Sequence, residues 1–275
     1  MSVARLRTPV LMLHHVEPAP LEPPATHPNS YLTPQRLGLL LDLLDRGRFT
    51  TLTLAQAARR WHAGETLPRR AVVLTFDDGC RCFAEHAAPA LAARGRTATL
   101  FALSGELGGS NVWDRREEPR ERREVLLTAD ELRRLDPGIE IGCHGSHHVR
   151  LPDCDDRRLR EETSGAKRDL ESELGRPVET FCYPWGVFTP RAREAVREAG
   201  FLAAAGIDDC SGTSPDDPWG LPRWSLGPGD SRFEIWLKLT GTYRWWRRLP
   251  KVGILTALRK LGGRGAERKS LDGER

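Results

Sequence analysis

The chain has 275 residues, of which 39% are hydrophobic and 29% are charged, so it can form one barrel-sized globular domain with a tail. Its 42 basic and 38 acidic residues leave a net charge of +4, a mixed balance that argues against a nucleic-acid-binding protein. No segment approaches the roughly 20 apolar residues that a membrane-spanning helix needs.

The amino terminus lacks the pattern of a secretion signal. Its apolar run covers only residues 10–13, far less than a signal-peptide core, so we expect a cytoplasmic protein. The six cysteines show neither CxxC spacing nor the density of a disulfide-rich scaffold, and we expect reduced thiols.

Hydrophobic patterns predict alternating strands and helices. In chain order, we expect strands at 9–16, 70–77, 97–103, 139–143, 179–183 and 201–206, and helices at 35–46, 53–63, 83–94, 128–135, 161–174 and 190–199. Segment 105–123 is glycine-rich, then highly charged and without periodicity, which predicts a loop that is a candidate mobile lid. The alternation predicts a parallel sheet covered by helices, either doubly wound or closed as a barrel, with ligands beyond the carboxyl ends of the strands.

Three polar clusters follow predicted strands: TFDDG at 75–79, HGSHH at 144–148 and FCYPWG at 181–186. Taken alone, Asp-Asp-Gly and Pro-Trp-Gly are usually turns, and an HxxxH pair is often a surface or capping feature. Because the carboxyl ends of parallel strands meet at one edge, the clusters should converge. Their order and placement favour a single site.

The residue types of the first two clusters suit a hydrolytic metal site. His144 and His148 have the spacing of a chelating pair, and one carboxylate would complete a three-ligand site. Such a site also needs a carboxylate base outside the ligand set, and the adjacent Asp77 and Asp78 can supply both. Gly79 would let the chain turn sharply after the pair.

Over residues 8–226, these motifs resemble the polysaccharide deacetylase family, carbohydrate esterase family 4, in the form whose general-acid motif lies at the amino terminus. The resemblance implies a distorted (β/α) barrel with seven strands. It makes Asp77 the base, and Asp78, His144 and His148 the ligands of a divalent metal, zinc by default and cobalt or nickel as alternatives. It makes the backbone N–H of Trp185 the oxyanion donor.

The chain departs from the family's pattern at two supporting positions. Gly145 stands where the family commonly has Ser or Thr, so a supporting hydrogen bond is either absent or supplied by Ser146. Cys182 stands where many members have an arginine that orients the base, and Arg223 is the expected substitute.

The general acid of the family is a histidine, and none follows His148. The segment LMLHHV at 11–16 resembles the amino-terminal strand of the permuted members, which makes His14 the expected acid. We expect it to face the metal from the side opposite Asp77, with His15 the less sensitive neighbour. The alternative is that His14 is a core or turn histidine.

The resemblance implies removal of N-acetyl groups from an amino sugar in a polysaccharide, a lipid-linked glycan or a sugar precursor. Two alternatives stay open, a metal-dependent hydrolase of another non-peptide C–N bond and a non-catalytic carbohydrate-binding barrel. Four tryptophans are candidates either for contact with a sugar face or for the core: Trp113, Trp185, Trp219 and Trp224.

We expect a catalytic barrel at 1–232, a basic aromatic helical extension at 233–262 and a disordered tail at 263–275. Within 233–260, aromatic and aliphatic residues alternate with basic ones, which suits the headgroups of an anionic membrane at its inner face. Packing of the same residues against the barrel is the alternative.

Overall fold

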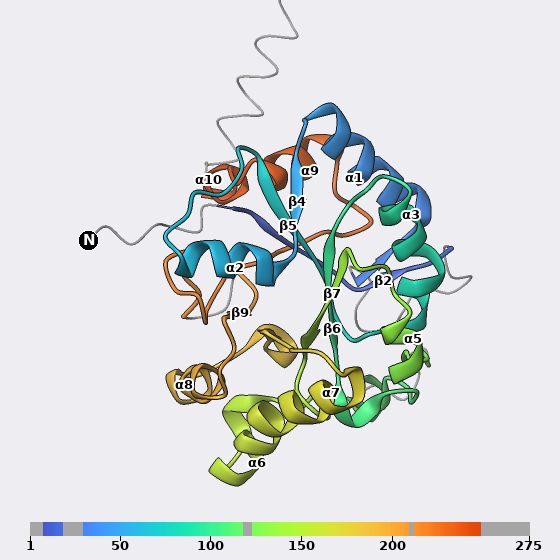
Figure 1. The fold of residues 1–275 in the computed structure, drawn as a ribbon. Helices are drawn as coiled ribbons and strands as arrows, with labels where there is room; N and C mark the ends of the chain where they lie inside the picture. Colours follow the sequence, from blue (N-terminus) through green and yellow to red (C-terminus); the bar gives the residue numbers. More distant parts are fainter. Residues whose placement is uncertain (1–7, 19–29, 118–122, 209–211, 249–275) are drawn as a thin grey trace, which may run out of the picture. The chain divides into compact units, whose positions relative to one another are not determined.

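The structure, a computed structural model, describes residues 8–18, 30–117, 123–208 and 212–248 (Figure 1). The chain divides into two compact units, Met1–Gly241 and Thr242–Arg275. The described part of the second unit holds one helix, α10 (Tyr243–Arg248). All other described helices and strands lie in the first unit.

A curled parallel sheet forms the centre of the first unit (Figure 1). In spatial order its strands are β10 (Trp224–Ser225), β1 (Val10–Leu13), β5 (Ala71–Phe76), β6 (Ala98–Ala102), β7 (Ile139–Cys143), β8 (Thr180–Cys182) and β9 (Ala203–Ala205). The segment 221–225 closes the ring, because Leu221 bridges to Ala205 of β9 while Trp224 pairs with Leu11 of β1. The expected distorted (β/α) barrel with seven strands is therefore confirmed. An additional short strand, β4 (Thr50–Leu52), pairs with β5 outside this order.

Strands β5 and β6 are apolar except for one threonine each. All six residues of β5 and all five of β6 are buried. Such continuous runs are typical of parallel strands that are covered on both faces.

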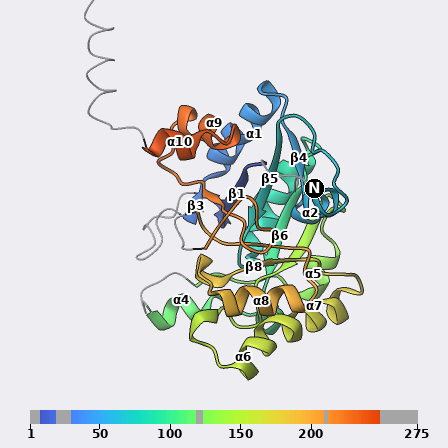
Figure 2. The same cartoon turned by 90° about the vertical axis from the view of Figure 1, so that its left-hand side faces the viewer.

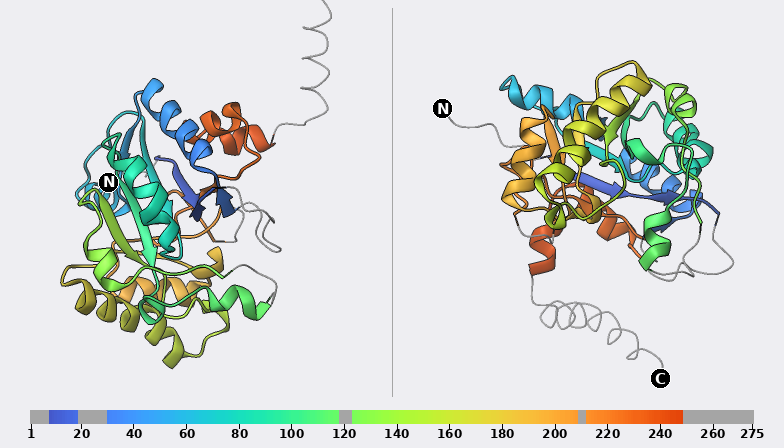
Figure 3. Two further views of the ribbon diagram at one scale, coloured as in Figure 1. Left: turned by 90° about the vertical axis from the view of Figure 1, so that its right-hand side faces the viewer. Right: turned by 90° about the horizontal axis from the view of Figure 1, so that it is seen from below.

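Helices surround the sheet (Figures 2 and 3). They are α1 (Pro34–Arg46), the π-helical turn η2 (Phe83–Ala87) with α3 (Ala88–Ala92), α5 (Ala129–Arg133), α6 (Asp156–Arg160), the π-helical turn η5 (Glu161–Gly165) with α7 (Ala166–Leu174), α8 (Pro190–Glu198) and α9 (Arg232–Leu239). Most of the predicted helices are present, although the expected helices 83–94 and 161–174 each begin with a π-helical turn.

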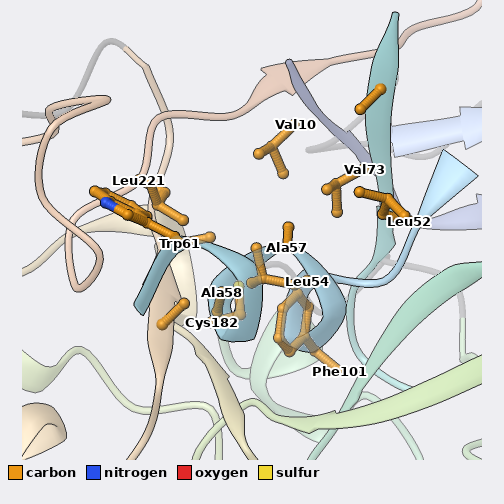
Figure 4. Close-up of a cluster of buried hydrophobic side chains, with 13 residues drawn as sticks. Val10, Leu52, Leu54, Ala57, Ala58, Trp61, Val73, Phe101, Cys182 and Leu221 are labelled. Atoms are coloured by element: carbon orange, nitrogen blue, oxygen red, sulfur yellow. The ribbon is translucent and has the colours of Figure 1, made fainter. Parts of the chain in front are cut away.

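Helix α2 (Leu54–His62) covers the amino end of the barrel (Figure 4). A capping box of Thr53 and Gln56 starts it. Its apolar face, which includes Leu54 and Trp61, packs against side chains of β1, β5 and β6. This end of the barrel is therefore closed by apolar packing, and the opposite end is left for the polar clusters.

The structure differs from the sequence-based expectations in four short segments. Strands β3 (Tyr31–Leu32), β4 and β10 were not predicted, because two or three residues are too few for a hydrophobic period. They exist because they pair with β2 (His15–Val16), β5 and β1, respectively. The expected loop at 105–123 was wrong over α4 (Val112–Glu117). That helix is anchored by Trp113, which is 5% exposed.

Helix α9 belongs to the first compact unit, although it falls within the extension expected at 233–262. Its residues Ile235 and Leu239 are buried, and Trp236 packs edge-on against Phe49. The buried ammonium of Lys238 is 2.6 Å from Asp230. These groups contact the barrel, so membrane contact is not supported here, and no described helix has the length and apolar character needed to cross a membrane. Residues 249–262 of the extension and the tail at 263–275 lie outside the described residues.

Candidate active site

The polar clusters meet at the carboxyl ends of four strands. The aspartate pair directly follows β5, the histidine loop directly follows β7, the Pro-Trp-Gly turn η6 (Pro184–Gly186) follows β8, and the amino-terminal histidine pair follows β1. A cavity of about 240 Å³ is lined by all seven residues expected in the site: His14, Asp77, Asp78, His144, His148, Trp185 and Arg223. The barrel thus brings together residues that are up to about 200 positions apart in the chain.

Asp77 is held by a buried arginine. Both carboxylate oxygens accept hydrogen bonds from Arg223, Oδ1 from Nη1 at 2.7 Å and Oδ2 from Nη2 at 2.8 Å. Arg223 is 1% exposed and also donates to Thr75 Oγ1, the Gly206 carbonyl and the Cys182 sulfur. Burial raises the pKa of Asp77, but the Arg223 guanidinium outweighs it and holds that pKa below its usual range. Arg223 therefore fixes the orientation of the Asp77 carboxylate.

Asp78, His144 and His148 form a compact group of possible metal ligands. One donor atom from each lies within 4.8 Å of the others, and all three residues are buried. The Nε2 atoms of His144 and His148 are 3.4 Å and 3.6 Å from Asp78 Oδ1. These separations are too long for good hydrogen bonds but fit atoms that share one ion.

Hydrogen bonding around this group leaves ligand atoms available. His144 Nδ1 donates to the Cys182 carbonyl at 2.8 Å, because a carbonyl only accepts, so the Nε2 lone pair faces Asp78. Asp78 Oδ1 and His148 Nδ1 are buried without a hydrogen-bond partner in the described structure. A buried orphan carboxylate oxygen beside two imidazoles fits a divalent cation.

The electrostatics of the group also favour a cation. Burial would raise the pKa of Asp78, but the His144 and His148 imidazoles hold it well below its usual range. Burial lowers the pKa of His148 to about 3, so its imidazole is neutral at neutral pH, as a ligand must be. Burial also lowers the pKa of His144, but Cys182 and Asp78 raise it well above its usual value. A metal would therefore displace a proton at His144.

His14 lies beside Asp77. Its Nε2 is 3.7 Å from Asp77 Oδ2 and its side chain is 22% exposed, so it is not a core histidine. The expectation that it would lie on the side opposite Asp77 was wrong. Strands β1 and β5 are neighbours with Leu13 paired to Phe76, so the next residue of each strand emerges at the same place. Burial lowers the pKa of His14 despite the opposing effect of Asp77.

Trp185 lies in the turn after β8 with a φ of 61°, a left-handed backbone that is strained for a bulky residue. Its indole N–H donates to the His148 carbonyl at 3.2 Å. Trp113 of α4 stacks on the ring of the same histidine with centroids 4.7 Å apart, and the centroid of the Trp185 ring is 4.9 Å from it. Two indoles therefore contact the His148 ring, a role that the sequence patterns did not predict.

The other candidate tryptophans lie elsewhere. Trp219 donates its indole N–H to the Phe201 carbonyl, and Trp224 is in β10. Neither lines the cavity, whereas Trp113 and Trp185 do. Hydrophobic pattern alone could not separate these four because it carries no information on which strand end each residue reaches.

The remaining histidines near the site make other contacts. His15 is buried and stacks on Tyr31 with ring centroids 4.3 Å apart, and its Nδ1 is 3.8 Å from the Cys82 sulfur. His147 pairs with Glu106 and is 43% exposed. His147 thus points away from Asp78, His144 and His148, as expected.

Known proteins are similar to this chain over most of its length. The protein YxkH of Bacillus subtilis (strain 168) is 20% identical over 227 residues, which cover 82% of this chain and 73% of YxkH. The deacetylase PplD of Streptococcus pyogenes, solved in complex with acetate, superposes with a TM-score of 0.70 at 17% identity, covering 84% of this chain and 97% of PplD.

A second solved structure, the de-N-acetylase of Aggregatibacter actinomycetemcomitans, superposes with a TM-score of 0.66 at 18% identity, covering 84% of this chain and 99% of the other. These structural likenesses show a shared fold. The sequence model of the polysaccharide deacetylase family matches residues 64–204, which include Asp77, Asp78, His144, His148 and Trp185. The chain therefore belongs to the polysaccharide deacetylase family.

Proposed function

We propose that this protein is a metal-dependent hydrolase that removes N-acetyl groups from an amino sugar, with a divalent ion, zinc by default, held by Asp78, His144 and His148. The observation that carries the proposal is the position of these three donors within 4.8 Å of one another, beside the Asp77–Arg223 pair and in one cavity. A ligand set with an adjacent carboxylate outside it suits metal-assisted hydrolysis.

When bound, a divalent ion at such a site supplies Lewis acidity and lowers the pKa of water from ~15.7 toward ~7. Asp77 acts as the general base and removes a proton from the attacking water. Arg223 holds both of its oxygens in place and keeps the carboxylate ionised, which supports this role.

Two further groups complete the proposed reaction. The backbone N–H of Trp185 donates to the oxyanion that develops on the acetamide carbonyl. His14 protonates the nitrogen of the amino sugar as the C–N bond breaks, which releases acetate and a free amine. The partly exposed His14 side chain on the cavity wall supports its access to the leaving group.

The cavity supports a small sugar unit as the reacting group. Its volume of about 240 Å³ lies just below the ~300–1,000 Å³ that is typical of ligand pockets, and suits a single hexosamine residue. Trp113 and Trp185 supply apolar surface, and Ser30, Tyr31 and Asp114 supply polar groups for hydroxyls. We propose an N-acetylhexosamine within a polysaccharide, with lipid-linked and nucleotide-linked forms as the other candidates.

Acetate release tests the proposal. Purified full-length protein, stripped of metal and then reloaded with zinc, is incubated with N-acetylated oligosaccharides, a lipid-linked N-acetylhexosamine, a nucleotide sugar and small aliphatic amides. We expect zinc-dependent acetate release from at least one sugar and none from the aliphatic amides. Turnover of the amides alone would favour a hydrolase of another C–N bond, and sugar binding without turnover would favour a carbohydrate-binding protein.

A further inference from the structure

The loop that carries both histidine ligands has little regular structure of its own. It follows β7 and runs from His144 to His148, with Gly145 at a φ of 82° and His148 at a φ of 53°. Both values lie in the left-handed region, which is costly for His148. A loop in this conformation keeps its shape only if surrounding groups hold it.

The buried carboxylate of Glu162 contacts the middle of this loop. Its Oε2 accepts the backbone N–H of Ser146 at 2.6 Å and that of His147 at 3.1 Å. These two residues lie between the ligands, so the carboxylate fixes the peptide groups that connect His144 to His148. Glu162 is fully buried, and a buried carboxylate is costly unless strong partners compensate it.

The second oxygen of Glu162 pairs with a cation from the same helical segment. Arg158 Nη2 lies 2.8 Å from Glu162 Oε1. Glu162 itself belongs to η5, a π-helical turn between α6 and α7. Such turns insert an extra residue into a helix and are frequent at functional sites.

The position of Glu162 also explains why a glycine, Gly145, follows His144. A Cβ added to Gly145 would lie 2.8 Å from Glu162 Oε2, too close for any side chain while the carboxylate is there. The hydroxyl of Ser146, one of the two alternatives for the supporting hydrogen bond, is 3.3 Å from the Ser104 hydroxyl. The backbone N–H groups of Ser104 and Gly105 donate to the Gly145 and Ser146 carbonyls at 3.1 Å. The loop's own N–H groups at Ser146 and His147 are held by Glu162.

We propose that Glu162 is a positioning residue that holds the His144–His148 loop in its metal-binding conformation, an inference that rests on the proposed metal site. Glu162 is not among the cavity-lining residues, so it acts through the loop backbone. Groups that orient ligands from outside typically contribute 10–100-fold to metal affinity.

The chain offers a control in Glu171 of α7, whose side chain is 32% exposed. Its Oε1 accepts the backbone N–H of Val178 at 3.0 Å and pairs with Lys167 at 2.9 Å. Glu171 therefore combines a loop N–H with a cation four residues earlier in the helix, as Glu162 does. The loop that it supports leads into β8 and carries no metal ligand.

The test uses full-length Glu162→Ala, Glu162→Gln and Glu171→Ala proteins. Zinc affinity is measured by competition with a fluorescent chelator, and hydrogen exchange of the Ser146 and His147 amides is measured in the metal-free proteins. We expect zinc affinity to fall by about 10–100-fold in Glu162→Ala, with faster exchange of both amides. Glu162→Gln should lose less zinc affinity than Glu162→Ala, because its side-chain amide oxygen still accepts the two N–H groups.

Glu171→Ala should leave zinc affinity and the hydrogen exchange of the Ser146 and His147 amides unchanged. The inference is overturned if Glu162→Ala keeps wild-type affinity and protected amides, or if Glu171→Ala lowers affinity as much. Should Glu162→Ala fail to fold, a Glu162→Met protein, which fills similar space but accepts neither N–H, takes its place, and wild-type zinc affinity with wild-type exchange in that protein would overturn the inference in the same way. Failure of the wild-type protein to bind zinc would instead overturn the proposed function itself.

Discussion

Polar side chains at the two ends of the barrel differ in how completely they are hydrogen-bonded. Strand β7 shows this within five residues, since Glu140 lies near its amino end and His144 directly follows its carboxyl end. Glu140 accepts hydrogen bonds from the Thr99 hydroxyl at 2.9 Å, the Ala55 backbone N–H at 2.9 Å and the Thr180 hydroxyl. Its partners join two neighbouring strands and the start of α2, so both oxygens of this carboxylate are hydrogen-bonded.

The carboxyl end keeps unsatisfied and strained groups instead. Asp78 Oδ1 and His148 Nδ1 are buried there without hydrogen-bond partners among the described residues. Asp78, His148 and Trp185 all have positive φ, three of the five non-glycine residues with that conformation in the described part of the chain. Three strained residues and two orphan atoms of the described chain thus lie together around one cavity, as is frequent at functional sites.

Replacing the proposed base should give the largest change in activity. Asp77→Asn keeps the shape of the side chain but cannot accept a proton, so we expect acetate release to fall by about 10²–10⁴-fold, or ~3–5.5 kcal/mol of activation free energy. Zinc affinity should stay within a few-fold of the wild type because Asp77 is not a ligand in this proposal. Steady-state rates and zinc titration of the same protein check both points, and activity near the wild-type rate would remove Asp77 from the mechanism.

Removing the partner of Asp77 should mainly change stability. Arg223→Met leaves a buried carboxylate without its two charged hydrogen bonds, and breaking such a pair typically costs ~3–5 kcal/mol. Urea unfolding of the metal-free proteins measures the loss. If the free energy of unfolding changes by less than ~1 kcal/mol, the ion pair is not what holds the base.

Zinc should stabilise the wild-type protein by binding at the carboxyl ends of the strands and not at the amino end of the barrel. At a free zinc concentration 100 times its Kd, binding adds ~2.7 kcal/mol to the free energy of unfolding. A His148→Ala protein should lose most of this gain, whereas Glu140→Gln should keep it. Thermal melts with zinc and with a chelator compare the three proteins, and an equal gain in His148→Ala would place the ion elsewhere.

The smallest effect is expected at the amino end. Burial raises the pKa of Glu140, so the folded protein binds this proton more tightly than the unfolded chain. The stability contributed by the protonated side chain is present below its ordinary pKa near 4.5 and is lost as pH rises through the raised value. Glu140→Gln should therefore change the free energy of unfolding by only about 1 kcal/mol. Its stability relative to the wild type should increase from pH 4 to pH 7, because only the wild type loses the contribution of the protonated carboxyl group. Acetate release should be unchanged.

Measuring urea midpoints of both proteins at several pH values checks this pH dependence. A Glu140→Gln protein that loses stability relative to the wild type as pH rises would show that the carboxylate is favoured in the folded state.

The residues whose chemistry depends on local spacing could be predicted from the sequence. Asp77 and Asp78 are adjacent at the end of an apolar strand, and His144 and His148 share one loop, so a strand end and a short loop are enough to bring each pair to the same edge. The main strands and helices were predicted for a similar reason, because hydrophobic period and capping residues act within a few residues along the chain.

Only the tertiary structure decided contacts between distant segments. Arg223 reaches Asp77 across 146 positions because the segment 221–225 closes the barrel, and His14 lies beside Asp77 because β1 pairs with β5 in one register. The two-residue strand β10, the stacking of Trp113 on His148 and the support of the ligand loop by Glu162 likewise depend on how strands align and helices pack. A linear pattern does not encode strand register or barrel closure, because these arise from the simultaneous packing of all the elements.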